Sequence, residues 1–128
     1  MRGLLSVGLL CDQITVEENN WKNSRDSVAK AICARFKGKT LIFRSSTRAE
    51  DSWNHSLAGA YLSILDVLAH PADVSNAIDR VFMSYNKNTT DEHVLVQPMV
   101  ENVSISGVVL TRDLDTGAPY FVVNYDNY

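Results

Sequence analysis

The chain has few of the residues that mark special protein classes. It has 128 residues, with only two cysteines, six glycines and three prolines, which excludes a disulfide-stapled miniprotein, a collagen-like repeat and a low-complexity linker. No apolar run approaches the roughly 18–20 residues of a membrane-spanning helix. The net charge is −3, so we expect neither nucleic acid nor a membrane as a partner, because no basic field exists to hold either.

The remaining composition is that of one ordinary globular domain. Hydrophobic residues make up 45% of the chain and charged residues 21%, enough for one sizeable core. The apolar residues 1–11 lack a small-residue cleavage site, which favours a core element over an export signal. Cys11 and Cys33 lie in no metal-binding or redox spacing, so we expect two buried, reduced thiols in a cytoplasmic protein.

Two helices are predicted. The first runs from Ser24 to Phe36 and ends before Gly38, with one apolar face formed by Val28, Ala31, Ile32 and Phe36. Pro71 opens the second, whose apolar residues recur at helical spacing: Val74, Ala77, Ile78, Val81, Phe82 and Tyr85.

Strand-like segments surround these helices. One lies at residues 40–43 and three more at 93–100, 104–112 and 119–124, the last two forming a hairpin around the turn at 113–117. Strands with interspersed helices and a closing antiparallel hairpin predict an α+β fold, with a mixed or antiparallel sheet and flanking helices.

A polar stretch directly after the first predicted strand is the first candidate for function. It begins Arg44-Ser45-Ser46 and runs to Leu57, and no rule of core formation requires that composition. An arginine at a strand end, with hydroxyls beside it, suits a phosphate or another anion. The alternative is an arginine that pairs with Glu50 or Asp51.

Two further segments could approach a ligand closely. Gly59 and Ala60, with Ser63, leave the backbone accessible, although tight packing is the commoner reason for such small residues and no Walker lysine follows. Pro98 interrupts a strong strand and removes a ladder donor, as an adenine-reading hinge would require, with Met99 as a soft apolar surface. The alternative is an edge strand with a bulge.

The last segment with candidate residues is the predicted hairpin. Gly107 within a strand indicates close backbone approach. Arg112 and Asp113 at the strand end suit either a ligand pair or a turn-stabilising pair.

The order of these motifs resembles one family. RSS, ED, AG…S, VQPMV and SGVVLTRD…TG are similar to the N-terminal nucleotide-binding region of phosphoenolpyruvate synthase and pyruvate phosphate dikinase, over residues 41–117. The resemblance implies part of an ATP-grasp domain over residues 1–128, with ATP and Mg²⁺ as cofactors. It also implies these ATP-binding residues: Arg44 and Ser45, Gly59, Ala60 and Ser63 near the phosphates, and Gln97, Pro98 and Met99 along the adenine.

The resemblance also implies what the chain lacks. The family's ATP-contacting lysine segment, its magnesium ligands and its carrier histidine have no match, so we expect a fragment that is inactive without the remaining domains of the parent enzyme. The expected function is phosphoryl transfer from ATP through that histidine to pyruvate or L-glutamine. The alternative is a non-catalytic binding or assembly module that retains the scaffold.

The segment TRDLxTGAPY…NYD resembles a branch of the family found in surface-polysaccharide gene clusters, which includes L-glutamine kinase. Leu114 stands where the wider family has proline. Nothing in these residues identifies the acceptor.

Overall fold

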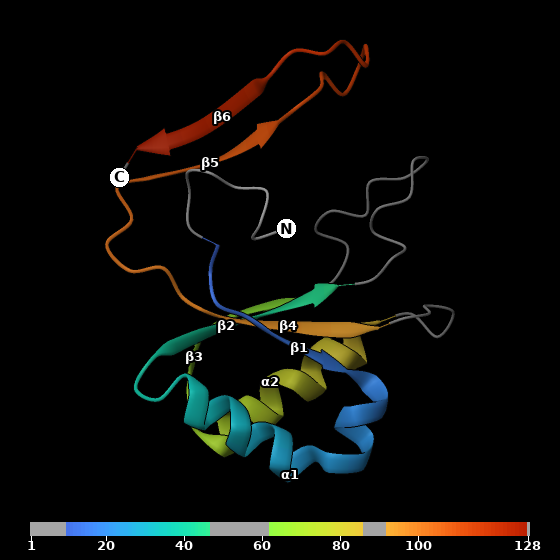
Figure 1. Cartoon of the computed structure of the whole chain (residues 1–128), viewed down its shortest axis with the longest axis vertical. Coiled ribbons are helices and arrows are strands. Elements are labelled where there is room, and N and C mark those ends of the chain that lie inside the picture. Colours follow the sequence, from blue (N-terminus) through green and yellow to red (C-terminus); the bar gives the residue numbers. More distant parts are fainter. Residues whose placement is uncertain (1–9, 47–61, 86–91, 128) are drawn as a thin grey trace.

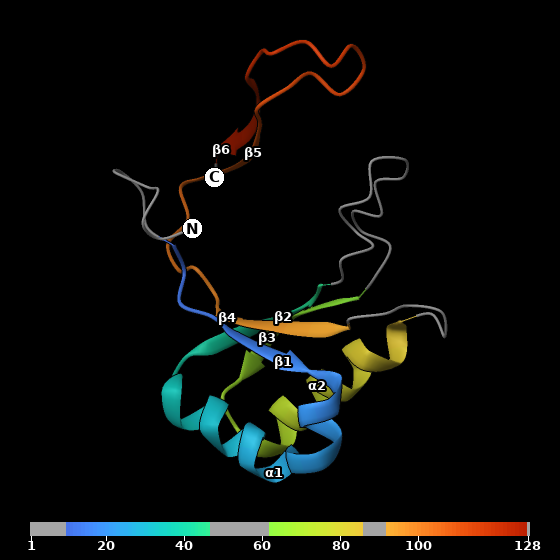
Figure 2. The ribbon, with the colours of Figure 1, turned by 45° about the vertical axis from the view of Figure 1, so that its right-hand side comes forward.

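The computed structural model describes residues 10–46, 62–85 and 92–127. Within them, two helices pack on one face of a four-stranded antiparallel sheet (Figure 1). A two-stranded hairpin lies beyond the sheet's other face, as the turned view in Figure 2 also shows. The expected α+β fold with an antiparallel sheet and flanking helices is confirmed.

The four-stranded sheet has the order β1-β4-β2-β3. Its strands are β1 (Ile14–Glu17), β4 (His93–Pro98), β2 (Thr40–Ser46) and β3 (Ser63–Leu68), and every neighbouring pair is antiparallel. The VQP segment therefore lies in a central strand, and its interpretation as an edge strand is wrong. Two residues of β3, Leu65 and Asp66, stand opposite Ile42 as a β-bulge, and Asp66 has a φ of 57°.

The core lies between the sheet and the helices α1 (Glu18–Arg35) and α2 (Pro71–Ser84). Five of the strand residues that point to the helices are at most 1% exposed, and they alternate with residues that point to the other face of the sheet. They are Val16 on β1, Leu41 and Phe43 on β2, and Val94 and Val96 on β4.

Helix α2 follows the sequence prediction closely. Pro71 is in its first turn, where the missing N–H leaves no hydrogen bond unmade. The predicted apolar stripe faces the core: Val74, Ala77, Ile78 and Val81 are buried, Tyr85 is 9% exposed and Phe82 is partly buried.

Helix α1 begins earlier than predicted. Six residues precede Ser24, whose φ of −145° and ψ of 37° form a kink rather than a helix start. Trp21 anchors this first part, because its indole N–H donates to Asp79 of α2 at 2.9 Å. The predicted buried Ala31 is exposed and Ala29 is buried instead, since residues 29, 32 and 36 share the face that meets α2. Gly38 has a φ of 74°, as expected just past a helix end.

The two cysteines are less buried than predicted. Cys11 is exposed and Cys33 is half-buried. Cys11 precedes β1 beside Asp12, whose carboxylate binds Arg35 at the surface, 2.6 Å from Nη2, so this segment lies outside the core. Burial raises the pKa of the Cys33 thiol, and Asp73 raises it further.

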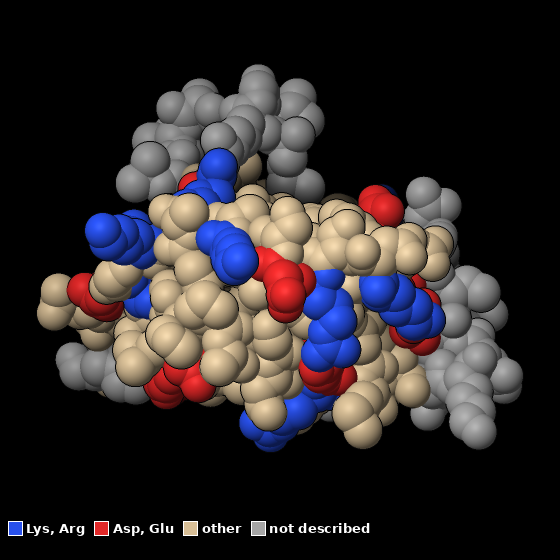
Figure 3. Space-filling view, turned by 90° about the horizontal axis from the view of Figure 1, so that it is seen from below, with Lys and Arg blue, Asp and Glu red and all other residues tan. Residues whose placement is uncertain are grey.

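The helix side of the molecule carries charges of both signs. Figure 3 shows lysine and arginine interspersed with aspartate and glutamate there, and Lys22 pairs with Glu18 at 2.6 Å. Neither described helix is both long enough and apolar enough to cross a bilayer.

Candidate functional site

The face of the sheet turned away from both helices carries three of the predicted site residues that belong to strands: Arg44, Ser63 and Gln97. Val94 and Val96 point into the core, so His93, Leu95 and Gln97 point to the opposite side. The same alternation applies to the other strands. We call this surface the open face and define it by Thr15 and Glu17 on β1, Ile42, Arg44 and Ser46 on β2, Ser63 on β3, and His93, Leu95 and Gln97 on β4.

Arg44 and Ser63 lie opposite each other on the open face. They are Cα partners across β2 and β3, and Leu95 of β4 is the partner of Arg44 on the other side. Arg44 lies within β2, because the strand continues to Ser46, rather than after it as the sequence predicts. The two paired strands therefore hold the exposed guanidinium of Arg44 beside the hydroxyl of Ser63. Both groups can donate hydrogen bonds to an oxyanion.

Gln97 lies on the same face, one row along β4 from the row of Arg44. Its Cα partner on β2 is Ile42, and its side-chain Nε2 donates to Oε1 of Gln13 at 3.2 Å. Gln13 precedes β1 and did not stand out in the sequence. Arg44, Ser63 and Gln97, predicted from separate motifs, therefore share one surface.

Pro98 and Met99 continue the central strand. Pro98 is the Cα partner of Leu41, and the Met99 N–H donates to the carbonyl of Thr40 at 2.8 Å. The missing N–H of Pro98 would point toward β1, whose pairing with β4 stops at Val96, so no ladder bond is lost. The Met99 amide is thus used within the sheet rather than exposed for a ligand.

The remaining predicted residues are placed differently. Ser45 lies on the helix side of β2 and is half-buried, so its side chain points away from Arg44. Gly59 and Ala60 lie outside the described residues, as do Glu50 and Asp51, the alternative partners for Arg44.

Tyr85 is a residue of this region that the sequence analysis counted only as core. Its hydroxyl accepts the backbone N–H of Ser46 at 2.8 Å and donates to the carbonyl oxygen of His93. Ser46 and His93 are Cα partners, so the phenol bridges β2 and β4 where the two strands reach the end of their pairing. A buried tyrosine requires a partner for its hydroxyl, and that requirement is the one signal of this role in the sequence.

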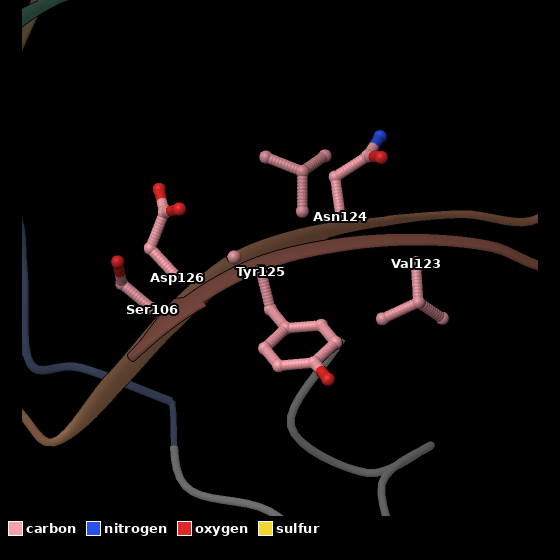
Figure 4. Close-up of a pocket in the computed structure, with 7 residues that line it drawn as sticks. Ser106, Val123, Asn124, Tyr125 and Asp126 are labelled. Atoms are coloured by element: carbon pink, nitrogen blue, oxygen red, sulfur yellow. The ribbon is translucent and has the colours of Figure 1, made fainter. Parts of the chain in front are cut away.

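The hairpin of β5 (Ile105–Leu110) and β6 (Val122–Asn127) explains Gly107 without a ligand. The Cα partner of Gly107 is Tyr125, and a Cβ on Gly107 would lie 2.3 Å from the carbonyl oxygen of Asn124. The close approach is therefore that of the partner strand. Strand β6 begins later than predicted, and Figure 4 shows Val123 and Tyr125 on one side of it and Asn124 and Asp126 on the other.

The turn of the hairpin settles the alternatives for Asp113. Its Oδ1 accepts the backbone N–H of Thr116 at 2.8 Å, the Thr116 hydroxyl at 2.7 Å and the N–H of Asp115 at 3.2 Å. These bonds, led by that of the Thr116 hydroxyl, lower the pKa of Asp113. Gly117 follows with a φ of 68°. Asp113 thus stabilises the turn, through Thr116 rather than through Arg112.

No group of three or more histidine, cysteine, aspartate or glutamate side chains is placed to hold a metal within residues 10–46, 62–85 and 92–127. The open face contributes one carboxylate, that of Glu17. This set does not fit a protein-held magnesium ion, which prefers several oxygen ligands.

A comparison with known families agrees with the motif order. No curated protein and no solved structure matches this chain significantly. A model of the pyruvate phosphate dikinase AMP/ATP-binding domain matches residues 22–126, a span that includes Arg44, Ser63 and Gln97. The chain therefore belongs to the pyruvate phosphate dikinase AMP/ATP-binding domain family.

Proposed function

We propose that the chain binds ATP across the open face of its four-stranded sheet, as part of an ATP-grasp phosphotransferase. One observation carries the proposal: the strand register brings Arg44, Ser63 and Gln97 onto a single face of the sheet. The family match supports a nucleotide as the ligand. The absence of a broad basic field does not oppose it, because a nucleotide requires only a few well-placed donors.

The order of residues along β4 gives the nucleotide a direction. Gln97 and Met99 would line the adenine, with the thioether of Met99 as an apolar surface for the ring. Pro98, the partner of the buried Leu41, would contribute by its backbone alone. The partner of Arg44 on β4 is Leu95, two residues before Gln97. At the rise of an antiparallel strand, this separation is about 7 Å. Arg44 and the hydroxyl of Ser63 would therefore hold phosphate oxygens.

The other predicted residues have lesser or separate roles. Ser45 points away from this face and would contribute by its backbone alone. Gly59 and Ala60 would approach the phosphates, as the resemblance implies. Magnesium would be brought by the nucleotide itself, because the open-face residues offer too few oxygen ligands to hold the ion.

The chemistry of the whole protein would be phosphoryl transfer in two steps. A histidine nitrogen of another domain attacks a phosphorus of ATP, forming a P–N bond as the P–O bond to the leaving nucleotide breaks. The P–N bond then breaks as the phosphoryl group passes to an acceptor, either the enol oxygen of pyruvate or the amide nitrogen of L-glutamine, and the acceptor loses its proton to solvent. Arg44 would offset negative charge that develops on the phosphates. We place this reaction in the cytoplasm, where ATP is abundant.

An NMR titration of the chain with ATP tests binding, because amide shifts report even a weak interaction. We expect shifts at open-face residues, and Arg44→Ala should weaken binding about tenfold or more, as for a hydrogen bond to a charged group. Arg80→Ala, an exposed arginine of α2 on the helix side, is the matched control and should bind as wild type. Wild-type protein that shows no shifts, or an Arg44→Ala variant that binds equally well, overturns the proposal.

The acceptor is tested separately. Phosphorus NMR of the protein with its parent domains, given ATP and either pyruvate or L-glutamine, would show a new phosphoenol or phosphoramidate signal. A P–N signal on glutamine favours the polysaccharide branch of the family. ATP binding without turnover on either acceptor would favour the non-catalytic module.

A further inference from the structure

Beyond Arg44, the open face ends in a row of three polar residues. His93 of β4 is the Cα partner of Glu17 on β1 and of Ser46 on β2. The sequence spreads these residues over most of the chain. Neither the motifs nor the family resemblance assigns a role to Glu17 or His93. The pairing of three antiparallel strands brings them together.

The backbone of this row is held in place from the helix side. The Tyr85 hydroxyl binds the N–H of Ser46 and the carbonyl of His93, so both residues are fixed relative to α2. Val94, the neighbour of His93 in β4, is fully buried, which directs the imidazole of His93 to the opposite, open face.

The position of His93 along β4 follows from the register. Gln97 lies at the adenine end of the proposed site, Leu95 marks the row of Arg44, and His93 lies in the next row. At the rise of an antiparallel strand, four residues span about 13–14 Å. His93 is thus on the side of Arg44 that faces away from the adenine segment.

We propose that His93 is a ligand of the terminal phosphate of the bound nucleotide and favours ATP over AMP; this rests on the function proposed above. His93 and Arg44 are diagonal cross-strand neighbours, a separation of about 7–8 Å that one phosphate chain can bridge. An imidazole offers an N–H donor to a phosphate oxygen. The Glu17 carboxylate would repel a phosphate, so the chain approaches His93 from the side of Ser46, which is also the side of Arg44.

The test compares affinities for ATP and AMP, measured by NMR titration of the same samples. His93→Ala should weaken ATP binding about tenfold and leave AMP binding unchanged, because a single phosphate reaches only the row of Arg44. His93→Gln, which retains an N–H donor, should recover part of the loss. His70→Ala, an exposed histidine next to α2, is the matched control and should change neither affinity.

The possible outcomes separate this inference from the proposed function. ATP affinity unchanged in His93→Ala, while Arg44→Ala weakens both nucleotides, overturns the role of His93 and leaves the site standing. Equal loss of ATP and AMP in His93→Ala also overturns it, since the effect is then not at the terminal phosphate. Failure of the wild-type chain to bind either nucleotide overturns both.

Discussion

The hydroxyl of Tyr85 accepts the backbone N–H of Ser46 at 2.8 Å, and by donating onward to the carbonyl of His93 it joins two central strands through a side chain. The ring belongs to the C-cap residue of α2, so one phenol connects a helix end to both strands. Arg44 stands two residues before Ser46 in the same strand. The bridge therefore holds the backbone of β2 two residues from Arg44, whose guanidinium lies on the open face.

Tyr85→Phe tests how much this bridge contributes to stability. The variant retains the ring but leaves the Ser46 N–H and the His93 carbonyl without the bridge, which should lower the free energy of unfolding by about 1–3 kcal/mol. Urea denaturation measures the change. Tyr120→Phe, a tyrosine that is 70% exposed, should unfold as wild type, and equal stability of both variants would show that the bridge contributes nothing.

Gly107→Ala should disrupt the hairpin. The added Cβ would lie 2.3 Å from the carbonyl oxygen of Asn124 and 3.0 Å from Tyr125, a clash that backbone atoms cannot relieve without separating the strands. Amide hydrogen exchange should show lost protection in β5 and β6 and unchanged protection in the four-stranded sheet.

Gly117→Ala is the control for that variant. Its Cβ would meet nothing within 4 Å, although Gly117 has a φ of 68°. It should therefore cost about 1–2 kcal/mol of turn strain while the strand pairing survives. Retained exchange protection in Gly107→Ala would contradict the contact seen here.

Those parts of the fold that depend on neighbouring residues were predictable from the sequence. The stripe from Val74 to Tyr85 repeats with the period of a helix, and Pro71 and Asp73 suit its first turn, so α2 appears where expected. The turn at Asp113 is equally local. The strand order is different, because it brings Glu17, His93 and Ser46 together from distant parts of the chain, and no local pattern encodes that pairing.

The residues of the candidate site also fall into those that the sequence predicted and those that it missed. The motifs picked out Arg44, Ser63 and Gln97, and strand alternation then places them on one face. The sequence missed Tyr85 because an apolar position in a helical stripe already explained it. It misplaced Cys11 because a short apolar segment suggests burial, whereas the ion pair of Asp12 with Arg35 lies at the surface.

Asp79→Ala should weaken the contact between the helices. The Asp79 carboxylate accepts the Trp21 indole N–H at 2.9 Å and also binds the guanidinium of Arg25, which lies over the indole ring. Because Trp21 is only 3% exposed, its N–H would lose a partner that water replaces poorly, at a cost of about 1–3 kcal/mol.

Urea denaturation followed by tryptophan fluorescence measures that change. Asp26→Ala, an exposed aspartate on α1, is the control and should leave stability within about 0.5 kcal/mol. If Asp79→Ala unfolds at the same urea concentration as Asp26→Ala, the indole hydrogen bond does not stabilise the helix pair.

The two thiols should react at different rates with a thiol reagent. Cys11 is exposed, whereas Cys33 is half-buried and burial raises its pKa, with a further contribution from Asp73. Burial slows access to Cys33 and its raised pKa lowers its thiolate fraction at pH 8, so it should be modified second. Asp73→Asn should speed its modification and leave the rate of Cys11 unchanged. Mass spectrometry of digested samples measures the two rates. Modification of Cys33 before Cys11 would contradict the burial described here.

The turn of the hairpin should open as the pH falls. Hydrogen bonds from Thr116, its hydroxyl first, lower the pKa of Asp113 below its usual 3.8. A group with a lowered folded pKa stabilises the folded turn above its unfolded pKa, and that contribution is lost as the pH falls through the folded pKa.

Thr116→Val removes the hydroxyl donor, so the pKa of Asp113 should rise toward 3.8 and the turn should open at a higher pH. Carbon NMR of the Asp113 carboxyl measures the shift, with Thr111→Val as the matched control outside the turn. An Asp113 pKa that is the same in both variants would mean that the Thr116 hydroxyl does not hold this carboxylate.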